Sequence, residues 1–164
     1  MNLKEINSLV ELFFKKYEEK FPKGIKGMKS HEETFLVSLK NKDLPDTNSG
    51  SYTYSWGNIG IKIKILSNYL EKILSKGDRC ILLSENRPEW LISDLAIMLS
   101  NAITVPAYTT YTENDYKYLI EDCQPSVVII SNNIMQKKLE KTIEEKEYIK
   151  SVVTFDVIPR ANTK

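Results

Sequence analysis

The segment KGDRCILLSENRPEW, residues 76 to 90, joins a turn, an apolar run, a polar loop and a tryptophan within fifteen positions. Its four consecutive apolar residues, Cys80 to Leu83, are typical of a strand that is covered on both faces in a parallel sheet. Beyond the polar loop, Asn86 can cap a helix that has Pro88 in its first turn and Glu89 three residues after the cap. The segment therefore predicts a strand that leads directly into a helix.

Loops that bind phosphate at a strand-to-helix join contain glycines, because the ligand has to approach the backbone closely. Residues 84–89 contain no glycine, so the sequence favours a structural join. Arg87 could still bind an acid or a phosphate, but packing of its aliphatic stem on Trp90 is the preferred interpretation. In that interpretation Trp90 anchors the helix.

After this join, strands and helices alternate to residue 155. Such an alternation predicts βαβ crossovers and an α/β fold in which helices flank a parallel sheet. Asn101, which tolerates positive φ, is expected to end the helix that begins at Trp90. The expected elements after the first strand are a helix over Trp90–Leu99, a strand over Ile103–Pro106, a helix over Glu113–Asp122, a strand over Ser126–Ile130, a helix over 133–146 and a strand over Ser151–Phe155.

The first fifty residues begin with an amphipathic pattern from Ile6 to Phe21, with aromatic residues on its apolar side. A membrane-surface role is conceivable, but the polar side carries charges of both signs, so docking on the chain's own domain is favoured. The runs Thr34–Leu39 and Tyr52–Tyr54 are expected to pair as a hairpin with a long loop. A helix is expected over 55–75, with Gly77 at its left-handed end.

The bulk composition narrows the class of protein. The 164 residues carry 23 basic and 22 acidic side chains, so there is no electrostatic case for nucleic acid as a partner. Apolar runs all fall short of the ~20 residues of a membrane span. Cys80 and Cys123 are expected to be free thiols of a cytoplasmic chain.

Three stretches carry a resemblance to a known family: SYTYSW at 51–56, the run from KGDRC to YTTYT at 76–112, and YLIEDCQPSVVII at 118–130. In order and spacing they resemble the first part of the AMP-forming acyl-CoA synthetases, with the long-chain fatty acid ligases as the nearest branch. The family pattern reads TY, GDRV, NRPEW, DLA, a glycine, VPxYxT and then YxxxDS before a strand. Asn101 stands where the family usually has glycine, and Cys123 where it usually has a small residue such as serine.

The resemblance implies the start of the large domain of an adenylate-forming enzyme. Such enzymes use Mg-ATP to convert a carboxylic acid into an acyl-adenylate and then transfer the acyl group to coenzyme A. Their phosphate loop, adenine segment, ribose aspartate and catalytic lysine come later in the family's chain, and nothing here resembles SGTTGxPKG. We therefore expect an N-terminal portion that is inactive alone and holds no cofactor itself, although the family uses ATP, Mg and coenzyme A.

A second hypothesis is a non-catalytic module that binds a partner through an exposed sheet or helix face. Its partner would be the remainder of the synthetase or a second copy. The expected organisation is the same under both hypotheses: residues 1–50 form the N-terminal helix, loop and strand, residues 51–156 form the α/β subdomain, and residues 157–164 form a tail. The Trp90–Leu99 helix, apolar on most sides, is expected to leave apolar surface bare.

No catalytic, cofactor-binding or metal-binding residue is assigned from the sequence. His31, the lone histidine, is expected to be a solvated loop residue, and Asp94 a carboxylate that is capped by a neighbour or a helix end. Tyr108 and Thr110 match the VPxYxT pattern and are expected to shape a loop at the carboxyl edge of the sheet, where ligands of such sheets bind. The tyrosines around them lack the basic lining of a single-strand nucleic-acid platform.

Overall fold

The computed structural model describes residues 6–20, 33–39, 51–144 and 146–156. The chain divides into two compact units, Met1–Leu66 and Ser67–Lys164. His31, the expected tail 157–164 and the connection over 40–50 lie outside the described residues.

The first unit contains α1 (Leu9–Lys20), β1 (Thr34–Leu39), β2 (Ser51–Ser55) and the greater part of α2 (Trp56–Leu70). Strands β1 and β2 are antiparallel, with Thr34 opposite Ser55 and a register irregularity just after Thr34. The hairpin expected from the two alternating runs is therefore confirmed. Helix α2 is shorter than expected, since it ends at Leu70 and gives way to turns.

The aromatic side of α1 is packed within this unit. The Phe13 ring is 6% exposed and lies edge-on to Phe35, with the ring centroids 5.5 Å apart. It also stacks on Trp56 at 5.3 Å. The Tyr17 ring fits against Gly60 of α2, where any Cβ would overlap it. These contacts agree with an aromatic stripe that docks on its own domain.

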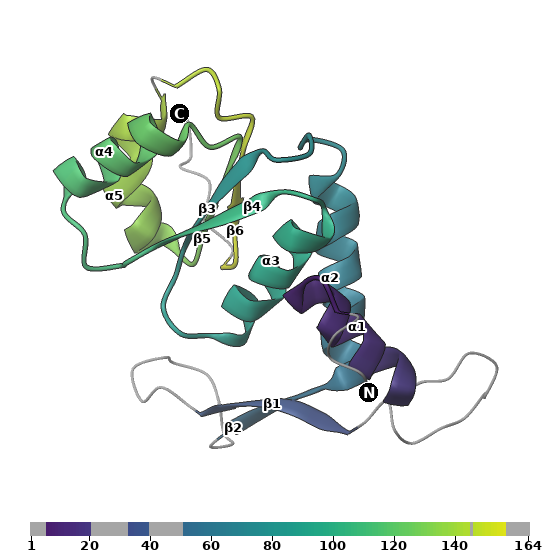
Figure 1. Cartoon of the computed structure of the whole chain (residues 1–164). Coiled ribbons are helices and arrows are strands. Elements are labelled where there is room, and N and C mark those ends of the chain that lie inside the picture. The colour runs from purple at the N-terminus through teal and green to yellow at the C-terminus, as the bar shows by residue number, and fades with distance from the viewer. Residues whose placement is uncertain (1–5, 21–32, 40–50, 145, 157–164) are drawn as a thin grey trace, which may run out of the picture. The chain divides into compact units, whose positions relative to one another are not determined.

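The second unit is an α/β layer structure (Figure 1). Its four strands are all parallel and lie in the order β4-β3-β5-β6, which confirms the predicted fold class. The strands are β3 (Arg79–Leu83), β4 (Ile103–Ala107), β5 (Val127–Ile130) and β6 (Ser151–Thr154). The helices between them are α3 (Pro88–Leu99), α4 (Glu113–Cys123) and α5 (Asn133–Glu144).

The sheet is covered on both faces. Figure 1 shows α4 and α5 on one face and α3 on the other. Strand β5 is buried along its whole length, as is β3 from Cys80 onward, which explains why both read as continuous apolar runs. The buried residues of the α4–α5 face are Ile81, Leu83, Ala107, Tyr116, Ile120, Val128, Ile130, Met135 and Leu139.

The start of α3 differs from the sequence prediction. Arg87, not Asn86, occupies the N-cap position, with φ −142° and ψ 159° and no side-chain capping hydrogen bond. Asn86 is exposed. The prediction of an Asn86 cap is wrong because Pro88, with its fixed φ, starts the helix and leaves Asn86 one residue too early.

Helix α3 is also less bare than expected. Its buried residues include Ile92, Leu95, Ala96 and Ile97, so most of its apolar side is already packed. Trp90 is half-buried. Exposed apolar surface of the second unit must therefore be sought on other elements.

The predicted left-handed positions are confirmed. Gly77 has φ 85° and Asn101 has φ 59°. Their main chains meet, because the Gly77 N–H donates to the Asn101 carbonyl at 2.9 Å. Gln124 also has positive φ, 44°, at the end of α4, and the sequence analysis missed it.

The two charged residues after Gly77 stabilise the amino ends of the strands. The Asp78 carboxylate accepts the Ser75 N–H at 3.0 Å and pairs with the Lys150 ammonium at 3.3 Å. Arg79 donates from Nε to the Cys123 carbonyl at 2.6 Å, at the C-terminal end of α4. The KGDR motif thus has a structural role at the edge opposite to the expected ligand edge.

Candidate functional site

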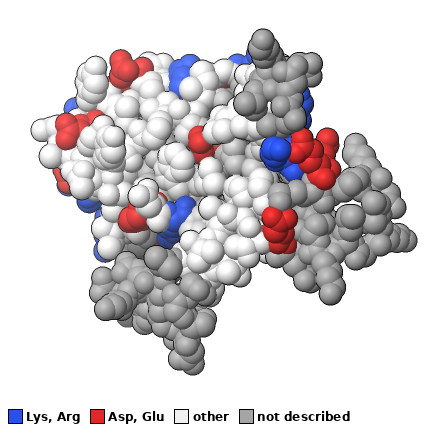
Figure 2. Space-filling model, turned by 60° about the horizontal axis from the view of Figure 1, so that its bottom comes forward, with Lys and Arg blue, Asp and Glu red and all other residues white. Residues whose placement is uncertain are grey.

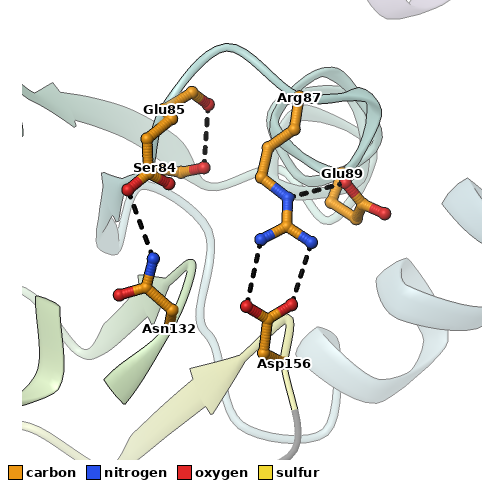
Figure 3. Close-up of polar contacts among 6 residues, drawn as sticks. All are labelled: Ser84, Glu85, Arg87, Glu89, Asn132 and Asp156. Atoms are coloured by element: carbon orange, nitrogen blue, oxygen red, sulfur yellow. Dashed lines mark hydrogen bonds and ion pairs between the residues drawn. The ribbon is translucent and has the colours of Figure 1, made fainter. Parts of the chain in front are cut away.

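The strand order defines a switch point at the carboxyl ends of β3 and β5. From β3 the chain continues into α3 on one face of the sheet, and from β5 it continues into α5 on the other face. Ligands of open parallel sheets bind in the crevice that this divergence opens. The residues there come from the loop after β3, the loop after β5 and the end of β6 (Figure 3).

Arg87 is the central side chain of this edge. Its Nη2 and Nη1 atoms donate to the two carboxylate oxygens of Asp156 at 2.9 and 3.3 Å, and its Nε donates to Glu89 at 3.0 Å. The guanidinium also lies over the Phe155 ring, 5.5 Å from its centroid. The aromatic ring beside the guanidinium is therefore that of Phe155. The packing of the Arg87 stem on Trp90 stays a prediction.

This environment favours the charged form of Arg87. Desolvation alone would lower its pKa, but the hydrogen bond to Asp156 and the charge of Glu89 outweigh it and raise the pKa. Three of the five N–H groups of Arg87 donate to carboxylates. They include one on each Nη atom, and these two atoms together would bind a phosphate in the bidentate manner.

A second polar pair lies beside it. Asn132, after β5, donates from Nδ2 to Glu85 at 3.2 Å, and its Oδ1 accepts the N–H groups of Ile134 and Met135. Asn132 therefore caps α5 and joins the loops after β3 and β5. Partial desolvation of Glu85 disfavours its charged form, but hydrogen bonds to the carboxylate and the nearby Arg87 outweigh this cost and lower its pKa.

The charge balance at the switch point is acidic. The carboxylates of Glu89 and Asp156 pair with the guanidinium of Arg87, and a third carboxylate, that of Glu85, lies nearby on Asn132. A triphosphate at the switch point would meet a net negative charge around Arg87, whose guanidinium is already paired with carboxylates. The described residues of this edge therefore suit a structural join better than a nucleotide site.

The loop after β4 forms the other part of the carboxyl edge. Tyr108 is 71% exposed, and its carbonyl accepts the hydroxyl of the buried Tyr116 at 2.7 Å. The Lys138 ammonium donates to the Thr109 carbonyl at 2.6 Å, and Thr110 is exposed. As the sequence predicted, Tyr108 and Thr110 lie in a loop at this edge.

Thr112 begins α4 with a complete capping box. Its hydroxyl accepts the Asp115 N–H at 3.3 Å, and the Asp115 carboxylate accepts the Thr112 N–H at 2.9 Å. The Thr112 hydroxyl also bonds the same carboxylate at 2.7 Å. These bonds fix the path of the chain where the β4 loop enters the helix.

The other residues considered in the sequence analysis, Asp94, Cys80 and Cys123, do not form a recognisable catalytic or binding site. Asp94 is half-buried in α3. Cys80 and Cys123 are free thiols, of which only Cys80 is fully buried. Burial raises the pKa of Cys80 to about 12, so it is protonated at neutral pH and unsuited to nucleophilic attack.

Most of the described surface on the face shown in Figure 2 is uncharged, and its few basic and acidic residues are scattered without a continuous basic area. Within the described residues, no three His, Cys, Asp or Glu side chains gather as a metal site would require. The helices of that same part of the chain are all too short or too polar to cross a membrane.

Sequence reasoning missed Asp156, Asn132 and Lys138. The capping role of Asn132 could have been predicted, because an asparagine just before an amphipathic helix is a preferred cap. The contacts of Asp156 and Lys138 could not be predicted from local sequence, since their partners lie 69 and 29 residues away.

Comparison with known proteins agrees with this architecture. Residues 29–164 match the profile of the AMP-binding enzymes, so the chain belongs to this family. Fatty acyl-CoA synthetase A of Dictyostelium discoideum is 31% identical over 120 residues, which cover 72% of this chain and 18% of that protein. Long chain acyl-CoA synthetase 4 of Arabidopsis thaliana is 24% identical over 151 residues, covering 85% and 23%.

Solved structures share the fold. A protein assigned as a long-chain-fatty-acid CoA ligase from Rhodopseudomonas palustris superposes with a TM-score of 0.69 at 16% identity, over 93% of this chain and 34% of that one. The anthranilate CoA ligase AuaEII, solved with anthranoyl-AMP, gives 0.65 at 18% identity, over 89% and 25%. The chain thus resembles the N-terminal part of acyl-CoA synthetases and spans about a fifth of the length of the first two relatives.

Proposed function

We propose that this chain supplies the N-terminal scaffold of a long-chain fatty acid–CoA ligase. In such an enzyme Mg-ATP activates a fatty acid as acyl-adenylate, and the acyl group then passes to the thiol of coenzyme A. The relatives named as fatty acyl-CoA and long chain acyl-CoA synthetases support this substrate class.

We further propose that the 164 residues do not catalyse adenylation by themselves. One observation carries this proposal. At the switch point both Nη atoms of Arg87 donate to the Asp156 carboxylate, and its Nε atom pairs with Glu89. Transfer of the adenylyl group from ATP depends on positive groups that are oriented toward the charge developing on the phosphates, and the switch point offers a paired cation instead. The glycine-rich phosphate loop is also missing from the sequence.

ATP–pyrophosphate exchange tests both parts. The purified 164-residue protein, incubated with Mg-ATP and long-chain fatty acids, is expected to show no acid-dependent exchange. The long-chain-fatty-acid–CoA ligase of Bacillus subtilis, another relative, is the positive control for the assay. Fatty-acid-dependent exchange by the 164 residues alone would show that they hold a complete adenylation site.

The ligase origin itself needs a separate test. The coding DNA downstream of residue 164 should be translated in all frames and searched for a segment like SGTTGxPKG. A match is expected if the chain belongs to a ligase. Its absence over several hundred bases would favour the second candidate function, a non-catalytic interaction module.

One feature favours that second candidate. Strand β6 is at the edge of the four-stranded sheet, and no further described strand pairs with its outer side. A free strand edge can accept another chain.

A further inference from the structure

Helix α1 is anchored on the first unit by a single buried residue. Of the α1 side chains that the structure describes, Phe13 alone is buried, against the rings of Phe35 and Trp56. Two ion pairs of α1 join residues one turn apart within the helix itself, so they do not add to its docking. The helix has 12 residues, and an isolated helix of that length is marginal in water. The helical form of α1 therefore depends on its docked position.

A glycine inside α2 provides the seat for α1. Among the described residues Gly77 is the one glycine with positive φ, so the backbone at Gly60 does not itself require glycine. A glycine within a helix is less stable there than alanine. The reason for Gly60 is the Tyr17 ring, since a Cβ at this position would come within 2.9 Å of Cδ2 and 3.0 Å of Cζ. The missing side chain gives the ring of α1 its room.

One turn further along α2, Lys64 adds an electrostatic contact to α1. Its ammonium lies 5.2 Å from the centroid of the Phe14 ring and 5.3 Å from that of Tyr17. A cation over the face of an aromatic ring is attracted by the ring's quadrupole. Lys64 is itself exposed, so this contact forms at the surface.

These contacts can break while the neighbouring ladder stays intact. The β1–β2 ladder includes no residue of α1, and residues 21–33 separate the helix from β1 along the chain. Segments with few buried apolar contacts open locally at a lower free energy than the core. Helix α1, with one buried side chain, fits that description.

We infer that α1 is a strap that opens independently of the two sheets, with Gly60 as its seat. In the docked state the helix covers the rings of Phe35 and Trp56, and in the undocked state the strap loses its helical form and leaves these rings bare. An order–disorder transition of one segment is a common way for a protein to switch between two states. The strap goes beyond the proposed ligase origin and stands whether or not that origin holds.

Hydrogen exchange of the 164-residue protein, followed by mass spectrometry, tests the strap. In the parent, the α1 amides are expected to exchange at least about tenfold faster than those of β3 and β5. Their exchange should also respond weakly to low concentrations of urea, because a local opening exposes little surface.

Gly60→Ala should speed the exchange of α1 at least about tenfold and leave β3 and β5 unchanged, because the added methyl group overlaps the Tyr17 ring. Asn68→Ala is the matched control, since it also introduces alanine into α2 but at an exposed position. Tyr17→Ala should speed the exchange of α1 too. In that background Gly60→Ala should add nothing, because the ring that the methyl group would meet is gone.

Lys64→Met is the second test, and it applies if Gly60→Ala disturbs the whole fold. It removes the cation over the two rings and should speed the exchange of α1 a few-fold, on the order of the cation–π contribution, while Lys62→Met, exposed on the same helix, should not. Parent α1 amides that exchange as slowly as those of β3 and β5, with the same urea dependence, would show that α1 opens only with the whole fold. That result, or α1 exchange that neither Gly60→Ala nor Lys64→Met changes, would overturn the inference.

Discussion

Arg87 and Asp156 are held together by two parallel hydrogen bonds although 69 residues separate them in the chain. The pair joins the N-terminus of α3 to the end of β6 (Figure 3). Because the arginine is 27% and the aspartate 46% exposed, solvent screens the pair only in part.

A double-mutant cycle measures what this pair contributes. Arg87→Ala and Asp156→Ala, alone and combined, should give a coupling energy of about 1 kcal/mol, at the upper end for partly exposed pairs because the geometry is bidentate. Chemical denaturation supplies the unfolding free energies. Arg87→Lys is the control, since an ammonium cannot form the fork and should lose most of the coupling.

The same variants examine the alternative role of Arg87 as a ligand group. Thermal melts with and without ATP or coenzyme A should show no ligand-induced shift in the parent or in Arg87→Ala. A nucleotide-induced stabilisation that Arg87→Ala removes would contradict the structural role.

The strands and their order along the chain were predictable because their signals are local. The apolar runs before Ser84 and Ser131 fill buried strands, and the position of Asn101 after an apolar helix matched its left-handed backbone. Such signals depend on residues within one turn or one strand of each other.

The polar contacts of the switch point were not predictable in the same way. The guanidinium of Arg87 lies over Phe155 because β6 ends beside the β3 loop, and that neighbour is set by the whole sheet order. The Asn86 cap failed for a local reason, because two overlapping start signals, an asparagine and a proline, compete within three residues.

Capping offers a direct comparison of two helix starts. Thr112→Ala removes a hydroxyl that accepts the Asp115 N–H, and should cost about 1 kcal/mol of unfolding free energy. Asn86→Ala removes an exposed side chain that caps nothing, and should change stability by less than about 0.5 kcal/mol. Urea titrations of the two variants separate these values; equal losses would mean that α3 starts at Asn86 in solution.

Tyr116 tests the support beneath the β4 loop. The ring is 1% exposed and its hydroxyl donates to the Tyr108 carbonyl at 2.7 Å. Tyr116→Phe keeps the buried ring and removes this bond, which should cost about 1 kcal/mol. Tyr118→Phe, on the exposed side of the same helix, is the control and should be neutral.

Hydrogen exchange of the Tyr111 amide extends the Tyr116 test to the loop itself. The Tyr111 N–H donates to the Tyr108 carbonyl at 3.2 Å, the same oxygen that accepts the Tyr116 hydroxyl. Faster exchange is expected in Tyr116→Phe than in the parent or in Tyr118→Phe. Unchanged exchange would show that the tyrosine hydroxyl does not hold the loop.

Asp78 is expected to make the stability of the second unit depend on pH. The hydrogen bond from the Ser75 N–H is the largest cause that lowers its pKa, and Lys150 acts in the same direction against the cost of burial. A carboxylate whose pKa is lower in the folded state contributes stability that is complete well above the unfolded value of about 3.9 and is lost as pH falls through the folded value.

Asp78→Asn should therefore lower the melting temperature at neutral pH, and its deficit against the parent should shrink as the pH falls below about 4. Asp122→Asn, an exposed aspartate of α4, is the control and should follow the parent. Melting curves from pH 7 downward measure both, and a deficit that stays constant to the lowest pH would show that the Asp78 charge does not stabilise the fold.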